Sequence, residues 1–239
     1  MGRILTFDVR ALAAAATLLA ACLNAAAQQP QPAQGAPAAP TQGAQPAIEE
    51  WKDDFDGERL DETKWERYTF EGGGGGKVEL KEKQLRMRGG EGSRSGVRSR
   101  QSFGGERFFV QAQLTKVGER APGPGEQGMQ AGTGVLTVLF GGNPANRIEW
   151  LLRSDGIFEA WLVVDGRSER IDNRQLATKA KTLWLGVGRR GEQIFLMVND
   201  KVALERNVRG LASNFKVMLY GFGTTENSWD SISVQTRKQ

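Results

Sequence analysis

Short apolar runs separated by tight-turn residues dominate the sequence from residue 107 onward, and they limit the possible folds more than any other feature. Two Asp-Gly pairs, at 155–156 and 165–166, are strong signals of tight turns in antiparallel hairpins, and Asn-Asp at 199–200 is a good one. No long stretch keeps a helical period, so the pattern predicts an all-β sandwich or barrel. The runs are rich in Val, Ile, Phe, Leu and Trp and cover 107–117, 134–142, 146–156, 157–166, 182–191, 193–208, 215–223 and 228–236.

The segment 48–239 has a size and charge that suit one large β domain. It holds about 190 residues, too few for two ordinary domains of this kind. The whole chain has a formal net charge of +4, and without its first 27 residues the charge is +3. This charge is mild, and the sequence has neither a basic amphipathic helix nor a nucleic-acid-binding motif. Nucleic acid is therefore not expected as a partner.

The first 27 residues have the layout of a secretory signal. Arg3 and Arg10 belong to the basic start, and 11–20 is an unbroken run of Ala, Leu and Thr followed by small residues. This run is about half the roughly 20 residues that a transmembrane helix needs, so we expect export rather than membrane insertion. Two cleavage sites remain open. Leu-Ala-Ala-Cys before residue 23 resembles a bacterial lipobox, which would lipidate Cys22, and Ala-Ala-Ala at 25–27 resembles an ordinary signal-peptidase site.

The localisation that follows is periplasmic, outer-membrane-anchored or secreted, and contact with a membrane is expected only through a lipid anchor. Cys22 is the only cysteine of the chain, so the exported domain is expected to have no internal disulfide. Residues 28–47 contain no charged and no large apolar residue, which predicts a disordered tether stiffened by proline. At about 3.1 Å per residue such a tether would reach roughly 60 Å.

Four segments of the domain support a resemblance to a known family. They are WKDDFDGERLDETKW at 51–65, GVRSRQSFGGERFFVQAQL at 96–114, TLWLGVGRRGEQIFLMVNDKVALE at 182–205 and SWDSISV at 228–234. In order and spacing they are similar to the concanavalin A-like lectin/glucanase superfamily, in particular the laminarinase-like family 16 glycoside hydrolases and their non-catalytic relatives. The resemblance implies a jelly-roll sandwich of two antiparallel sheets whose concave face grips a glycan.

The catalytic motif of that family is incomplete in this sequence. Its retaining hydrolases carry Glu-x-Asp-x-Glu or Glu-x-Asp-x-x-Glu on one strand, which holds a nucleophile and a general acid about 5 Å apart. On the matching strand, the positions in phase are Arg147, Glu149, Leu151 and Arg153, so one carboxylate remains. Glu159 on the next strand offers a cross-strand partner for Glu149. The chain also lacks histidine, which excludes Ser-His and Cys-His nucleophile systems.

Aromatic residues indicate binding more strongly than cleavage. Protein sites for sugars place aromatic faces against C–H surfaces and use Arg, amides and carboxylates for the hydroxyl groups. Most Trp residues are expected in the core, but Trp161 and Glu159 share the less apolar face of their strand. The expected glycan site comprises Trp161, Glu159, Glu149, Arg147, Arg153 and Arg98.

Arg94, Arg98 and Arg100 lie in phase along one strand. They form either a basic strip in the same cleft, which would favour a uronate-rich or sulfated ligand, or a solvated strand face. The sequence does not decide between these two arrangements.

The acid-rich opening DDFDGERLDETKW at 53–65 has two interpretations. In the resembled family, a carboxylate of this motif and an Asp of the last strand commonly share a structural calcium ion, and Asp54 and Asp230 match those positions. The alternative is an acidic turn without a metal, in which Asp53, Asp56 and Asp61 are turn residues and Asp61 caps a short helical turn at 62–64. Either interpretation makes the stretch structural rather than catalytic.

Three functions follow from these observations. The one that the sequence favours is an exported, lectin-like carbohydrate-binding domain without hydrolytic activity. The alternatives are a divergent glycoside hydrolase that uses Glu149 and Glu159, and a structural or protein-interaction module of the cell envelope.

Overall fold

The computed structural model describes residues 47–70, 76–90, 93–118, 133–175, 182–223 and 226–237. The predicted signal, Cys22 and all but the last residue of the predicted tether lie outside these residues. The described part of the chain consists of strands joined by turns and irregular segments, as the short apolar runs predict. No helix in it is long and apolar enough to cross a membrane.

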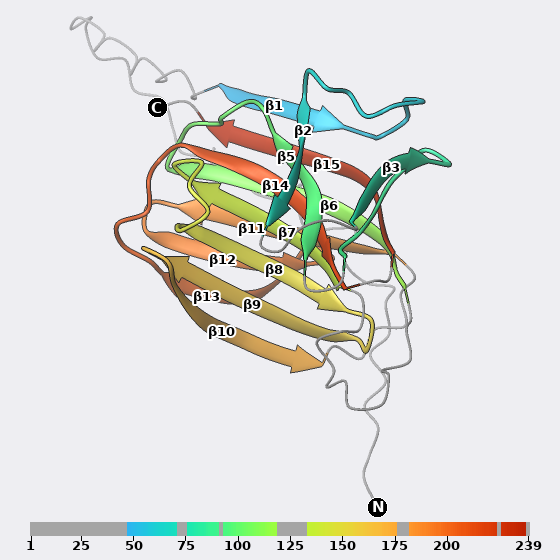
Figure 1. Ribbon diagram of the computed structural model, residues 1–239. Coiled ribbons are helices and arrows are strands. Elements are labelled where there is room, and N and C mark those ends of the chain that lie inside the picture. The colour runs from blue at the N-terminus through green and yellow to red at the C-terminus, as the bar shows by residue number, and fades with distance from the viewer. Residues whose placement is uncertain are drawn as a thin grey trace, which may run out of the picture. The chain divides into compact units, whose positions relative to one another are not determined.

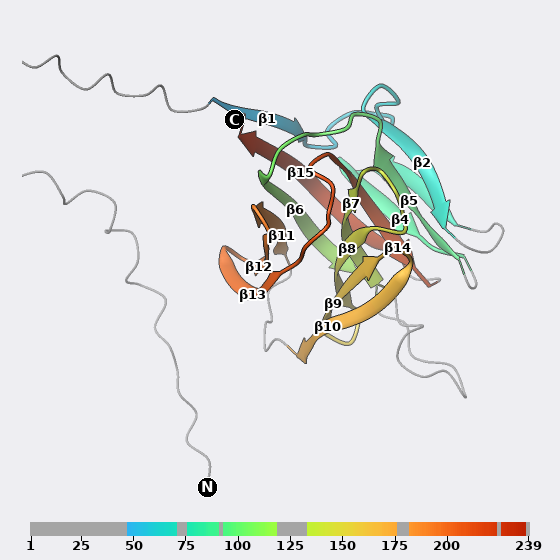
Figure 2. The same ribbon diagram turned by 90° about the vertical axis from the view of Figure 1, so that its left-hand side faces the viewer.

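The strands form two antiparallel sheets, which Figures 1 and 2 show stacked on one another. The eight-stranded sheet has the order β13-β12-β11-β6-β15-β4-β3, with β1 also paired to β15. Its strands are β1 (Ile48–Asp53), β3 (Lys77–Lys81), β4 (Gln84–Arg88), β6 (Arg107–Val117), β11 (Leu183–Arg190), β12 (Gln193–Val198), β13 (Lys201–Asn207) and β15 (Asn227–Arg237).

The seven-stranded sheet has the order β10-β9-β8-β7-β14-β5-β2. Consecutive strands such as β5 and β6, or β6 and β7, lie in different sheets, which gives the connectivity of a jelly roll. The predicted all-β jelly-roll sandwich is therefore confirmed. The strands of this sheet are β2 (Trp65–Phe70), β5 (Arg94–Ser99), β7 (Thr133–Phe140), β8 (Arg147–Arg153), β9 (Ile157–Val164), β10 (Arg167–Gln175) and β14 (Phe215–Phe222).

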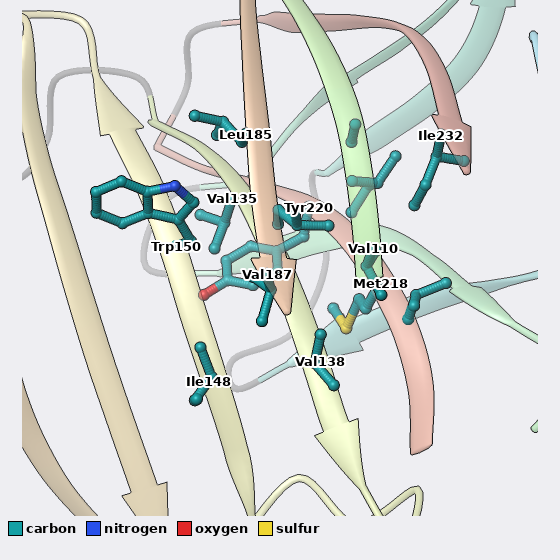
Figure 3. Packing of buried hydrophobic residues seen from close by; sticks show 14 of the residues in the cluster. Val110, Val135, Val138, Ile148, Trp150, Leu185, Val187, Met218, Tyr220 and Ile232 are labelled. Carbon is teal, nitrogen blue, oxygen red and sulfur yellow. The ribbon is translucent and has the colours of Figure 1, made fainter. Parts of the chain in front are cut away.

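The main core lies between the sheets because successive side chains of a strand point to opposite faces. Figure 3 shows part of this packing, with Val187 of β11 on one side and Val138, Ile148 and Trp150 of β7 and β8 on the other; all four are fully buried. Trp150 also donates a hydrogen bond from Nε1 to the carbonyl oxygen of Met197 on β12, over 2.9 Å. One face of β8 thus packs in the core, and the side chains of the opposite face point away from the eight-stranded sheet.

The predicted hairpin turns are present. Asp165 and Gly166 have φ values of 49° and 78°, and Asn199 and Asp200 have φ values of 47° and 62°. Positive φ at both central residues is the mark of a type I′ turn, whose twist matches the flanking strands. The second turn divides the predicted run 193–208 into two strands, β12 and β13.

Several strands have no apolar run from which they could be predicted. β10 reads RSERIDNRQ and is an edge strand with mostly exposed residues. Its ladder with β9 is antiparallel and contains a register shift between Arg170 and Asp172. A strand paired on one side only, with both faces largely solvated, needs no hydrophobic alternation, so its sequence does not show it.

The acid-rich opening connects β1 to β2 and is held by its own carboxylates. Asp61 accepts hydrogen bonds from Thr63 N at 2.9 Å and Thr63 Oγ1 at 2.6 Å, and this lowers the pKa of the Asp61 carboxyl. Asp53 accepts from Phe55 N at 2.9 Å and from Trp65 Nε1 at 2.7 Å. Phe55 and Trp65 are buried in the core, so the hydrogen bonds of Asp53 hold this connection next to two core side chains.

Candidate binding site

A cavity of about 130 Å³ lies on the face of the seven-stranded sheet that points away from the eight-stranded sheet. Six of the seven strands of this sheet, all except β2, contribute to its walls. The lining residues are Arg94, Thr133, Val135, Arg147, Glu149, Leu151, Arg153, Glu159, Trp161, Ser168, Tyr220 and Phe222. Five of the six residues predicted for the glycan site are therefore brought together in one cavity.

The register of β8 against β9 sets the positions of the two glutamates. Glu149 pairs with Trp161, and Leu151 pairs with Glu159. Glu149 and Glu159 are therefore diagonal neighbours rather than directly opposed. Diagonal positions of an antiparallel ladder lie about 7–8 Å apart, compared with about 5 Å for directly opposed ones.

Glu149 is 4% exposed and lies among arginines. Arg147 donates to its Oε1 from Nε over 2.6 Å, and Nη1 of Arg94 lies 3.5 Å from the same oxygen. Arg94 comes from β5, which is separated from β8 by β14 and β7. A buried carboxylate needs such partners because an isolated charge is costly to remove from water.

Glu159 is 3% exposed and has its own pair of donors. Arg153 donates to Oε1 from Nη1 over 2.9 Å, and Trp161 donates to Oε2 from Nε1 over 3.0 Å. Burial opposes the charge of Arg153, but hydrogen bonds with Glu159 and Asp155 outweigh it and raise the pKa of Arg153. Both glutamates of the cavity are thus held by guanidinium groups.

Trp161 is half-buried and keeps part of its indole accessible from the cavity. Its N–H is satisfied by Glu159, and the guanidinium carbon of Arg170 lies 5.9 Å from the ring centroid. The hydrogen bond fixes the orientation of the ring. What the indole offers to a ligand is therefore its apolar surface rather than its donor.

Tyr220 and Phe222 of β14 line the same cavity, and sequence reasoning did not assign either residue to a site. Burial raises the pKa of Tyr220 well above its ordinary value, and the Glu149 carboxylate raises it further. Arg94 lies 5.9 Å from the Tyr220 ring and 5.5 Å from the Phe222 ring, within the range of cation–π contacts. The alternation of Met218, Tyr220 and Phe222 on one face of β14 is the signal that could have placed them.

Arg98 does not line the cavity. It donates to Glu66 from Nε over 2.8 Å and lies over the ring of Tyr68, 4.2 Å from the centroid. Arg100 donates to the carbonyl oxygen of Glu62 over 2.5 Å. The arginines of this segment are thus engaged by separate partners and do not act as one basic strip.

One arginine donor of the cavity has no partner within the described residues. Nε of Arg153 is buried and forms no hydrogen bond, while both terminal nitrogens of the same side chain are engaged by Glu159 and Asp155. A buried polar atom in this position is costly unless water or a ligand oxygen satisfies it. The donor is therefore an unsatisfied polar atom of the described residues in the wall of the cavity.

Three other tryptophans of the strands lie outside this cavity. Trp150 and Trp229 are fully buried in the core, and Trp229 donates to Asn227 Oδ1 over 2.7 Å. Trp184 of β11 is half-buried and pairs with Gln113, on the outer face of the eight-stranded sheet.

The residues expected to bind calcium fit that ion poorly. Oδ1 of Asp54 lies 2.8 Å from Nζ of Lys52, so a cation already accompanies this carboxylate. Asp230 lies at an irregularity of β15, between Trp229 and Ser231. Within the described residues, no group of three or more His, Cys, Asp or Glu side chains is placed to hold a metal ion. Calcium takes six to eight oxygen ligands, and the two carboxylates alone do not supply that number. Calcium binding through Asp54 and Asp230 stays a prediction.

No protein-family model and no curated protein sequence matches this chain. Its fold matches solved structures. The endo-β-1,3-glucanase from Pyrococcus furiosus is similar with a TM-score of 0.60 and 12% identity, over 79% of this chain and 94% of that one. A non-specific endo-β-1,3(4)-glucanase of glycoside hydrolase family 16 has a TM-score of 0.60 and 11% identity, over 82% and 94% of the two chains.

An endo-acting O-glycanase from the human gut microbiota has a TM-score of 0.58 and 16% identity, over 79% of this chain and 99% of that one. At these identities the likeness concerns the fold alone. The chain has the concanavalin A-like jelly-roll fold found in the family 16 glucanases, as its four motifs predict.

Proposed function

We propose that this protein is an exported, lectin-like domain that holds a glycan in the cavity around Trp161 without cleaving it. The observation that carries the proposal is the orientation of Trp161, whose N–H is bonded to Glu159 while its ring lines a cavity walled by charged side chains. A fixed aromatic face beside polar groups is the combination that sugar rings require. The fold is also that of enzymes whose substrates are glycans.

The charge balance of the cavity favours a ligand with hydroxyl groups rather than acidic groups. Three arginines and two glutamates line it, and each glutamate is within ion-pair distance of at least one arginine. Paired guanidinium and carboxylate groups can still donate to and accept from hydroxyls at their outer atoms. A uronate or sulfate would instead have to compete with Glu149 or Glu159 for the same donors.

The same pairing argues against hydrolysis. A retaining glycosidase needs two carboxyl groups about 5–5.5 Å apart, one of them able to donate a proton. Here the two glutamates occupy diagonal positions and each is engaged by an arginine. A divergent hydrolase remains the second candidate, because two buried glutamates do line one cavity.

The test is binding of the protein to a glycan array and to immobilised polysaccharides. Trp161→Ala is expected to abolish retention. Trp184→Ala, which removes a half-buried tryptophan from the other sheet, is the matched control and should leave retention unchanged. Release of reducing ends by the wild type, lost in Glu149→Gln and Glu159→Gln, would establish the hydrolase instead. No retention on any glycan would favour a structural or protein-interaction module.

We also propose that the domain is exported and anchored by lipid at Cys22. The proposal rests on the sequence pattern alone. Mass spectrometry of the mature protein from the producing cell distinguishes a lipidated N-terminus at Cys22 from an unmodified one at Gln28. Loss of the protein from the membrane fraction in Cys22→Ser is the expected companion result.

A further inference from the structure

A second hollow, of about 610 Å³, lies on the outer face of the eight-stranded sheet. It extends over β15, β6, β11 and β12, which are neighbours in that sheet (Figure 1). It is therefore on the opposite sheet from the cavity around Trp161. No acidic residue lines this hollow, whereas four arginines do.

Three of these arginines form a row across the strands. Arg107 of β6 pairs directly with Arg190 of β11, and Arg237 follows Thr236, the residue of β15 that pairs with Phe108. Neighbouring strands lie about 4.8 Å apart, and like charges directly opposite each other are destabilising. Within the described residues, none of these three exposed side chains forms an ion pair or a side-chain hydrogen bond. The row thus carries three positive charges that no ion pair within the described residues neutralises, although Glu106 and Glu192 lie near enough to act on the neighbouring Arg189.

The fourth arginine has a different role. Arg189 is buried and donates to the carbonyl oxygens of Gly191, Leu211 and Ala212 over 2.7, 3.1 and 2.6 Å. Arg189 therefore supports the loops at this end of the sheet and does not belong to the row formed by the other three arginines.

Two phenylalanines with nearly parallel rings lie beside the arginine row. Phe109 of β6 and Phe195 of β12 both pair with Gly188 of β11. Their ring planes are within 16° of each other, with centroids 6.4 Å apart. A Cβ atom on Gly188 would lie 2.1 Å from the Phe195 ring, so glycine is what lets the ring lie across the strand. Both rings are half-buried and line the hollow.

The aromatic surface and the cationic row are close enough for one ligand to touch both. Arg107 and Phe109 are two residues apart on β6, and so are Arg190 and Gly188 on β11, which corresponds to about 6.8 Å along the strands. Both rows extend perpendicular to the strands. An extended polymer crossing the strands could therefore lie along both rows at once.

We propose that Arg107, Arg190, Arg237, Phe109 and Phe195 form a second ligand site, which binds an acidic polysaccharide bearing carboxylate or sulfate groups. Guanidinium groups bind such anions with paired, charge-assisted hydrogen bonds. The phenyl faces contact the C–H surface of the sugar rings. This site does not depend on the cavity around Trp161.

The geometry favours a polysaccharide over a membrane or a nucleic acid. A membrane-binding surface projects apolar side chains into the lipid, whereas these rings lie close to the backbone of β11 at Gly186 and Gly188 and line a hollow. The sequence has no nucleic-acid-binding motif, and its N-terminal segment predicts export. The chemistry of the two sites also differs, because the arginines of the first cavity form ion pairs with its glutamates, whereas Arg107, Arg190 and Arg237 form no ion pair with an acidic residue in the described part of the chain.

The test measures the affinity of the protein for dextran sulfate and for polygalacturonate, with neutral laminarin as the reference polymer, at about 150 mM NaCl. Arg107→Gln/Arg190→Gln is expected to weaken binding at least tenfold and to reduce the slope of log affinity against log salt by about 2. Arg59→Gln/Arg88→Gln removes the same charge from exposed positions outside the hollow and is the matched control.

Two further variants separate this site from other effects. Phe195→Leu is expected to weaken binding severalfold with an unchanged salt slope, because it removes the ring and keeps apolar bulk. Trp161→Ala is expected to leave the affinity for acidic polymers unchanged, so failure of the first site and failure of this one are distinguishable. The Tm of every variant confirms that it is folded.

Three outcomes would overturn the proposal. The first is no binding to either acidic polymer, and the second is an equal loss in both double variants, which would indicate non-specific charge attraction. The third is tighter, arginine-dependent binding to a single-stranded oligonucleotide or to phosphatidylglycerol vesicles, which would identify a different class of partner.

Discussion

Replacing Glu159 with glutamine is expected to lower the free energy of unfolding by about 2–3 kcal/mol. Glu159 is 3% exposed, and its carboxylate accepts from Arg153 over 2.9 Å. Removing one partner of a buried pair costs roughly 3–5 kcal/mol, because the other charge remains buried without compensation. The cost is smaller here since Arg153 keeps its ion pair with Asp155 at 2.5 Å, and glutamine keeps an oxygen for the Trp161 N–H.

The assay is urea-induced unfolding at about pH 7, with the free energy obtained by linear extrapolation and the slope m compared between variants. Glu169→Gln is the matched control, since Glu169 forms a 2.8 Å ion pair with Arg206 on the protein surface. Exposed pairs of this kind contribute at most about 1 kcal/mol, so the control should lose little.

A double variant separates the ion pair from other effects of the substitution. Arg153→Met/Glu159→Gln removes both charges and is expected to recover part of the stability lost in Glu159→Gln, since the charge that loses its partner is then Asp155, whose side chain is 38% exposed to water. If Glu159→Gln loses no more stability than Glu169→Gln, Glu159 is not a desolvated partner of Arg153 and the electrostatic description of the cavity is wrong.

Three further predictions concern the rest of the domain. A hydrogen bond from Arg98 lowers the pKa of Glu66. The ionised carboxylate therefore stabilises the fold at pH values above its ordinary pKa, and this contribution is lost as the pH falls through the folded-state pKa. In urea unfolding between about pH 5 and pH 2, the free energy of unfolding of Glu66→Gln should depend less on pH than that of the wild type. Gly188→Ala places a methyl group 2.1 Å from the Phe195 ring and is expected to cost about 1–3 kcal/mol in the same assay, and a neutral result would show that the ring is free to move. If calcium binds through Asp54, it will raise the Tm by mass action, and this rise should vanish in Asp54→Asn. A Tm that changes with neither calcium nor chelator would support the acidic turn without a metal.

Local patterns predicted the parts of this protein that depend on local rules. The type I′ turns at 165–166 and 199–200 follow from Asp, Asn and Gly, which tolerate positive φ. The strand 107–117 was predicted with its observed bounds, and buried residues alternate with half-buried ones from Phe108 to Thr115. The edge strand β10, with its polar sequence, has no such alternation and was not predicted.

The site divides in the same way. Trp161 and Glu159 were placed on one face of their strand by alternation, and five of the six predicted residues line the observed cavity. Arg98 lies outside this cavity, because its partner Glu66 lies on β2, and the pairing of β2 with β5 is not visible in either strand alone.

The sequence by itself determined that the described chain forms strands, where several hairpins turn and which side chains share a strand face, since each of these depends on neighbouring residues. Only the tertiary structure decided what those faces meet. Arg94 reaches Glu149 because β14 and β7 bring β5 and β8 into one sheet, and Phe195 lies across Gly188 because β11 and β12 pair in that register. Such contacts join residues that are distant in the chain or depend on strand register. They form only when the sheets assemble, so the sequence of a single strand does not reveal them.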